Sequence, residues 1–125
     1  MCSYISEKFY TWTDNKGSLF SHINIDTMLA NISLYWITGC IGASFWPYYA
    51  RHRSDWPIDI DNPITVPMGY SEFPKEIFSP PNSLASQFYK NILLWEKHNS
   101  GGHFAAMEKP KELASDVNKF VKDVI

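Results

Sequence analysis

The chain has 125 residues, of which 45% are hydrophobic and 16% aromatic, and its formal net charge is −2 at neutral pH. This length suits one ordinary domain, and the apolar content excludes a disordered or low-complexity protein. Because no excess of basic residues exists, a nucleic-acid partner has no electrostatic support. The two cysteines form no disulfide framework, and the four histidines lack a metal-ligand spacing, so no metal site is expected.

The first part of the chain predicts two helices. Apolar residues recur at helical spacing over residues 3–14, and turn-forming residues follow at 14–18. Residues 25–27 offer an N-cap for a second helix. Its expected buried cluster consists of Met28, Leu29, Ile32, Tyr35 and Trp36.

The second helix belongs to a stretch without charge, from Met28 to Trp46, that is long enough to raise the question of a membrane span. Polar residues and two glycines, at positions 39 and 42, dilute it, which favours a buried or crevice-lining helix. Pro47 ends or kinks the apolar run. Residues 51–63 are polar and indicate a surface connection, and the N-terminus has no signal-peptide pattern. We therefore expect a chain that is cytoplasmic or peripheral to a membrane.

The second half alternates between strand and helix patterns. The short apolar run at residues 64–69 predicts a strand in which Pro67 marks either the end or an irregularity, and a loop is predicted at 69–76. A helix follows at 83–89 and a second strand at 91–96. The closing helix is expected to bury one apolar face, made of Leu113, Val117, Phe120, Val121 and Val124. Its remaining positions include Lys111, Glu112, Asp116 and Lys119.

This alternation implies an α/β fold with two parallel strands joined by a crossover. Parallel sheets are buried on both faces and are seldom only two strands wide. Neighbouring strands are therefore expected from elsewhere. Either another chain supplies them or, as we favour, this is the C-terminal piece of a larger protein.

A candidate general base follows the second predicted strand. Gly101 and Gly102 let the backbone turn sharply, and His103 comes next, at the edge where open α/β sheets place their sites. Glu76 lies beyond the preceding strand at the same edge, so its carboxylate could fix the imidazole tautomer while the other nitrogen activates water. Taken singly, Glu76 is most simply a solvated loop or helix-starting carboxylate, and Glu72 and Glu108 compete with it as the acid. The alternative for Glu108 is that it caps or begins the last helix.

Two tyrosines are candidates for stabilising a developing alkoxide. Tyr48 and Tyr49 follow the glycine-containing helix, and a phenolic hydroxyl can donate to such an oxygen. The default interpretation of both is amphipathic packing. A histidine beside glycines is likewise more often structural or exposed than catalytic. The order of acid before histidine nevertheless matches the α/β-hydrolase order.

Residues 101–110, which read Gly-Gly-His-Phe-Ala-Ala-Met-Glu-Lys-Pro, resemble the histidine motif of epoxide hydrolases of the microsomal and juvenile-hormone type. Three further segments of that family have similar counterparts here in the same order along the chain, at residues 5–14, 34–39 and 66–76. The resemblance implies the C-terminal part of an α/β-hydrolase fold. Residues 1–57 would form a helical lid (cap) segment and connection. Residues 58–125 would form the C-terminal part of the core, as a βαβα unit of the parallel sheet.

The resemblance also implies roles. His103 would be the general base, Glu76 the acid that orients it, and Tyr48 the second lid tyrosine, with Tyr49 as the alternative. The family opens an epoxide with an aspartate and hydrolyses the resulting ester to a diol, without a cofactor or metal. The substrate would be a small apolar epoxide. The family's nucleophilic aspartate has no counterpart in the matched segments, so this chain alone is predicted to be inactive.

Two functions of different classes follow. The first is an epoxide hydrolase to which this chain contributes the base, the orienting acid and one lid tyrosine. The second is a non-catalytic module that binds apolar ligands or proteins and covers its open sheet edge by self-association or with a partner. A lipase or other esterase is a weaker third interpretation, because the tyrosine-bearing lid motif points elsewhere.

Overall fold

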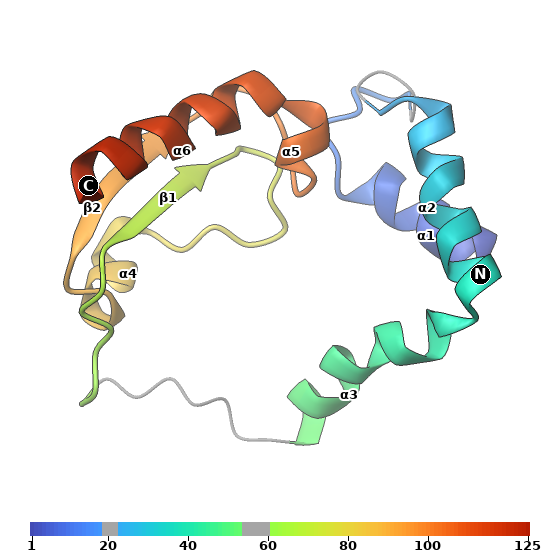
Figure 1. Cartoon of the computed structure of the whole chain (residues 1–125), viewed down its shortest axis with the longest axis horizontal. Helices are drawn as coiled ribbons and strands as arrows, with labels where there is room; N and C mark the ends of the chain where they lie inside the picture. The colour runs from blue at the N-terminus through green and yellow to red at the C-terminus, as the bar shows by residue number, and fades with distance from the viewer. Residues whose placement is uncertain (19–22, 54–60) are drawn as a thin grey trace.

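The structure is a computed structural model that describes residues 1–18, 23–53 and 61–125. Its elements, in chain order, are α1 (Cys2–Thr11), α2 (Ile25–Thr38), the 3-10 helix η2 (Cys40–Phe45), α3 (Trp46–Arg53), β1 (Met68–Glu72), α4 (Asn82–Phe88), β2 (Ile92–Lys97), α5 (Ala105–Glu108) and α6 (Pro110–Val124). Figure 1 shows α1 and α2 side by side, while α6 runs along the two strands at the other side of the molecule.

β1 and β2 pair in parallel and are connected through α4, which confirms the predicted α/β alternation. α6 packs against both strands. A glycine in β1 permits this contact, because a Cβ atom at Gly69 would lie only 3.0 Å from the ring of Phe120 in α6. The described sheet contains these two strands alone, so β1 has an edge that no described strand pairs with.

The first strand lies further along the chain than predicted. The part of the predicted strand before Pro67 contributes only an isolated bridge between Ile64 and Tyr89, and β1 starts at Met68 and extends into the predicted loop. Proline has no N–H to donate to a ladder, so Pro67 interrupts regular pairing. Pairing starts directly after it, where the Met68 N–H donates to the Asn91 carbonyl at 2.9 Å.

The boundaries of the early helices also differ from the prediction. α1 ends at Thr11 rather than near residue 14. The N-cap of α2 is Asn24, one position before the predicted 25–27, because its side-chain oxygen accepts the Asp26 N–H at 2.7 Å. α2 ends at Gly39, which has a φ of 65° that glycine adopts without strain. Arg51–Arg53, predicted as part of the connection, belong to α3.

The predicted burial of α2 and α6 is partly wrong. In α2 only Met28 is buried, and Trp36 is 76% exposed. In α6 the buried residue is Asp116, at 3% exposed, whereas Val117 and Val121 of the predicted apolar face are exposed. A sheet of two strands is narrower than the apolar stripe of α6, so part of that stripe has no described element to cover it.

The main apolar core belongs to the helical half. Ile5 and Phe9 of α1 pack with Ile23 and Met28, and Phe104 joins them from the loop after β2. The predicted boundary between residues 57 and 58 lies outside the described residues. In the described part, no single helix has both the length and the apolar character to cross a membrane. α2 together with residues 40–53 passes that test only as a pair bent by 109°.

Candidate active site

The glycine pair after β2 is required by close contacts. Gly101 has a φ of +109°, and a Cβ atom there would lie 2.7 Å from the Phe73 ring. A Cβ at Gly102 would lie 2.7 Å from the carbonyl oxygen of Trp12. The His103 N–H donates to that same carbonyl at 2.9 Å. The loop therefore carries His103 against the end of α1, at a distance that only glycine allows.

His103 forms a hydrogen bond with Glu76. The imidazole Nδ1 lies 2.6 Å from Glu76 Oε1, and the two side chains are 38% and 28% exposed. The two segments that carry these side chains are also joined through the backbone, because the Lys75 N–H donates to the Gly101 carbonyl at 3.0 Å. A carboxylate at Nδ1 favours the tautomer with the proton on that nitrogen, which leaves Nε2 able to accept a proton. Nε2 has no hydrogen-bond partner within the described residues.

The two competing glutamates have other partners. Glu72 accepts hydrogen bonds from the Trp95 indole at 3.0 Å and from Lys97 at 3.3 Å, and these two bonds lower the pKa of its carboxyl. Glu108 is buried and accepts the backbone N–H groups of Asp14 and Phe104, at 2.8 and 3.1 Å. Among the three carboxylates weighed from the sequence, the structure pairs Glu76 with the histidine.

Aromatic rings surround the imidazole. The His103 ring meets the Trp12 ring at a centroid distance of 5.0 Å and the Phe104 ring at 5.2 Å, in both cases edge to face. Such contacts restrict the orientation of the imidazole without hydrogen-bonding its free nitrogen. Sequence reasoning did not single out Trp12, although the helical spacing placed it at the end of α1.

Tyr48 lies on a small pocket that also reaches Phe104, the neighbour of His103. The pocket has a volume of about 180 Å³, and Phe9 and Tyr35 contribute further aromatic surface to it. Tyr4 lines it too, and burial, then the proximity of and hydrogen bond with Tyr48, raise the pKa of the Tyr4 hydroxyl. The two tyrosine hydroxyls are thus held together on the pocket wall.

Tyr49 points to a different surface. Its ring packs edge to face against Trp46 at 5.6 Å, and the guanidinium of Arg53 lies 4.6 Å from its centre. It lines a separate hollow with Gly42 and Phe45. This arrangement favours Tyr48 over Tyr49 as the tyrosine that belongs with His103.

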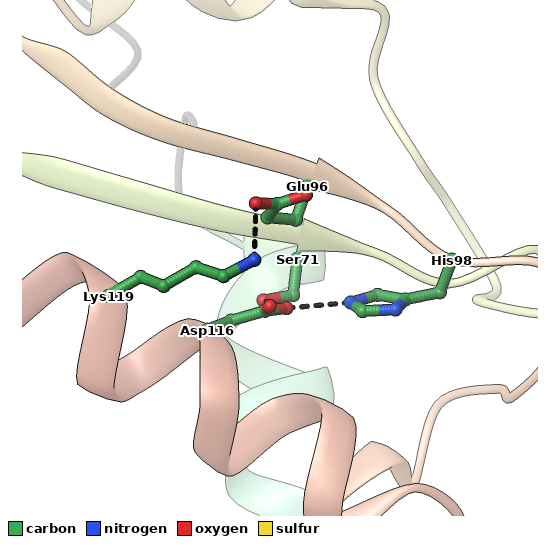
Figure 2. A network of polar contacts seen from close by, with 5 residues as sticks. All are labelled: Ser71, Glu96, His98, Asp116 and Lys119. Carbon is green, nitrogen blue, oxygen red and sulfur yellow. Dashed lines mark hydrogen bonds and ion pairs between the residues drawn. The ribbon is translucent and has the colours of Figure 1, made fainter.

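A second histidine–acid pair was not predicted. Figure 2 shows His98, just after β2, with its Nε2 2.6 Å from Asp116 Oδ2 of α6. Ser71 of β1 donates to the same oxygen at 2.8 Å, and nearby Lys119 pairs with Glu96 at 2.8 Å. The pair ties the ends of both strands to α6. The sequence did not indicate this pair, because Asp116 lies outside the predicted apolar face of the closing helix and was therefore expected to face solvent.

Two opposing effects act on the pKa of Asp116. Burial acts to raise it, but the hydrogen bonds from His98 and Ser71 outweigh burial and hold the pKa of this carboxyl below its ordinary value of 3.8. The carboxylate is therefore the favoured form in the folded chain. Since His98 and Ser71 both converge on this one oxygen, the cluster serves as a junction between sheet and helix.

No group of three or more histidine, cysteine, aspartate or glutamate side chains in the described ranges has an arrangement that would hold a metal ion. Asp55 and Asp59, two acidic residues of the predicted connection, lie outside those ranges. Among the described aspartates, none directly follows a strand.

Known proteins resemble this chain over nearly its whole length. A protein of Stigmatella aurantiaca recorded as "Putative epoxide hydrolase" is 38% identical over 94% of the chain, and rabbit (Oryctolagus cuniculus) epoxide hydrolase 1 is 34% identical over 97%. The crystal structure of juvenile hormone epoxide hydrolase from Bombyx mori superposes with a TM-score of 0.83 at 29% identity, over 96% of the chain.

The matched regions are only part of those proteins. The chain spans 26% of the Stigmatella protein, 28% of the rabbit protein and 30% of the Bombyx structure. No family model matches the sequence. The fold is nevertheless that of the corresponding part of α/β-hydrolases, with a helical segment followed by a parallel-strand unit.

Proposed function

We propose that this chain, which is homologous to part of the epoxide hydrolases, supplies the water-activating half of an epoxide-hydrolysing site. The observation that carries the proposal is the 2.6 Å hydrogen bond between His103 Nδ1 and Glu76 Oε1, with Nε2 left to act. In this scheme His103 is the general base, Glu76 orients it, and Tyr48 donates a hydrogen bond to the epoxide oxygen.

The reaction proceeds in two steps. A carboxylate oxygen attacks an epoxide carbon, the carbon–oxygen bond breaks, and the epoxide oxygen takes a proton from the tyrosine hydroxyl. Water then attacks the carbonyl carbon of the resulting ester while His103 Nε2 takes the proton of that water. The ester carbon–oxygen bond then breaks, and the leaving alkoxide takes the proton of the His103 imidazolium. The diol therefore carries one oxygen from the epoxide and one from the attacking carboxylate. The carboxyl group has regained its missing oxygen from water and returns its proton to the tyrosinate, which restores the starting forms of all three groups.

The attacking carboxylate comes from polypeptide outside these 125 residues. None of the described aspartates directly follows a strand, where an exposed nucleophile would be expected. The 125-residue chain by itself therefore forms no diol. The pocket beside Tyr48 is lined by aromatic side chains, and burial of apolar ligand surface against them stabilises binding. We therefore expect an apolar epoxide as substrate.

A hybrid protein tests this proposal. Residues 1–125 would replace the matching segment of the Bombyx mori enzyme, whose structure defines the junctions. We expect the hybrid to convert an aromatic epoxide such as styrene oxide to its diol. His103→Gln should stop turnover after ester formation, so the mass of the protein rises by that of the epoxide and stays raised.

The matched control is His98→Gln, which changes the other histidine that is paired with an acid. It should leave ester hydrolysis intact even if it lowers stability. A folded hybrid that forms no diol, or one in which His103→Gln turns over normally, would contradict the proposal. Saturable binding of an apolar ligand by such an inactive hybrid would favour the non-catalytic module.

A further inference from the structure

The loop that carries His103 is held by two buried carboxylates from distant parts of the chain. Asp14 Oδ2 accepts the Gly101 N–H at 3.0 Å, and Asp14 is 9% exposed. Glu108, 7% exposed, accepts the Phe104 N–H with Oε1 and the Asp14 N–H with Oε2, at 3.1 and 2.8 Å. We call Asp14 and Glu108 together the carboxylate clamp.

The clamp accepts two N–H groups of the loop, one two residues before the histidine and one directly after it. Gly101 donates to Asp14 and Phe104 donates to Glu108, while His103 itself donates to the Trp12 carbonyl. Backbone groups in a loop have no helix or strand partner, so each needs an acceptor when water is excluded. Here the acceptors are held in place, because Glu108 is the last residue of α5 and the backbone of Asp14, which follows the end of α1, donates to it.

The same network reaches the orienting acid. The Gly101 carbonyl accepts the Lys75 N–H at 3.0 Å, and Glu76 is the next residue. Any displacement of the loop would thus change the distance between His103 and Glu76 directly. A hydrogen bond of 2.6 Å tolerates little displacement before it weakens.

Burying two carboxyl groups in one loop network is costly unless their hydrogen bonds compensate. No lysine, arginine or histidine forms a salt bridge with either one among the described residues. Their described partners are backbone N–H groups. Apolar side chains would serve as well in an arrangement that only filled space, whereas acceptors aimed at the Gly101 and Phe104 N–H groups fix the loop two residues before and one residue after His103.

We propose that Asp14 and Glu108 are positioning residues for the general base, which hold the His103 loop in the geometry that pairs Nδ1 with Glu76. This inference rests on the proposed function for its catalytic consequence. Its structural consequence, the loss of the His103–Glu76 hydrogen bond when the clamp is opened, is independent of any turnover.

Histidine-selective NMR of the full 125-residue chain tests the structural consequence. In Glu108→Gln the side chain keeps its size but has one acceptor oxygen for two N–H donors. We expect the imidazole N–H resonance of His103 to move upfield or broaden and its nitrogen shifts to lose the single-tautomer pattern. Exchange of the Gly101 and Phe104 amides should accelerate.

His98 is the internal control, since it pairs with Asp116 in the sheet unit and its one ring contact toward the loop, among the described residues, is the stacked ring of Phe73 at 4.5 Å. The signals of His98 should stay unchanged in Glu108→Gln, while Asp116→Asn should change those of His98 and leave those of His103. General loosening of the fold would change both histidines in both variants, and that outcome would overturn the inference. So would an unchanged His103 in Glu108→Gln.

The hybrid protein supplies the catalytic measurement. Glu108→Gln should slow ester hydrolysis, on the order of tenfold to a hundredfold for a displaced catalytic group, and leave the rate of ester formation and KM nearly unchanged. Asp14→Asn, which keeps an acceptor for Gly101, should have a smaller effect in the same direction. If Glu108→Gln does not fold, the two Asp14 variants decide, because the His103 signals should change more in Asp14→Ala, which removes the acceptor, than in Asp14→Asn, which keeps it.

The two proposals fail in different ways. A parent hybrid that folds but forms no diol would refute the proposed function, and the NMR result would still decide the clamp. An active hybrid that turns over equally fast with and without Glu108→Gln would overturn the positioning role. Glu96→Gln, at an exposed ion pair, is the matched control for replacing a glutamate elsewhere.

Discussion

Replacing Gly102 by alanine should displace the loop that carries His103. The added Cβ would lie 2.7 Å from the Trp12 carbonyl oxygen and 3.1 Å from Thr13 Cα, whereas ordinary van der Waals contact begins at 3.4 Å. Both of these atoms belong to backbone, which cannot rotate away as a side chain can. The loop must therefore move by about 0.7 Å, or the end of α1 must.

The cost follows from two terms. Forcing an extra methyl group into a packed site costs about 1–3 kcal/mol, and loss of the hydrogen bond from His103 to Trp12 costs about 1 kcal/mol. We expect Gly102→Ala to lower the free energy of unfolding by roughly 2–4 kcal/mol. For a chain of this size that corresponds to a fall in melting temperature of roughly 8–16 °C. In the hybrid, ester hydrolysis should slow on the order of 100-fold.

Urea and thermal unfolding followed by circular dichroism would measure the first effect, and single-turnover kinetics the second. Gly42→Ala is the matched control, because no atom lies within 4 Å of its added Cβ and its φ is not in the left-handed region. It should stay within about 0.5 kcal/mol of the parent. If Gly102→Ala behaves like Gly42→Ala in both assays, the packing argument for the histidine loop is refuted.

Three further predictions concern the tyrosines, the buried acid and a surface pair. In the hybrid, Tyr48→Phe should slow ester formation on the order of 100-fold, as expected for one oxyanion donor, and Tyr49→Phe should not. Asp116→Asn should cost roughly 2 kcal/mol at pH 7 in urea unfolding, since two hydrogen bonds weaken. Because the folded-state pKa of Asp116 lies below 3.8, its carboxylate stabilises the fold above that pH, and this contribution disappears as the pH falls through the folded-state pKa. Over that acidic range Asp116→Asn should therefore lose less stability than the parent. Equal losses in the two proteins would contradict the argument. Lys119→Ala should lower the stability far less than Asp116→Asn by the same assay, since the ion pair between Lys119 and Glu96 is exposed to solvent.

Local chemistry made much of the fold predictable. Alternating apolar runs predicted the parallel pair, and the helical spacing of Ile5 and Phe9 predicted a buried face. The first strand was misplaced, since proline marks where a ladder is interrupted but not on which side of it the ladder continues. Asp116 was missed because a charge on a helix is usually solvated, and only the convergence of Ser71 and His98 makes its burial favourable.

The sequence by itself determined that a glycine pair delivers a histidine beyond a strand and that an acid precedes it at the same edge. Those features depend on residue type and on short spacing, which the chain carries locally. Only the tertiary structure decided which acid meets His103 and that Asp14 and Glu108, 94 positions apart, close on its loop. Such contacts depend on which distant segments approach, and no local pattern encodes that approach.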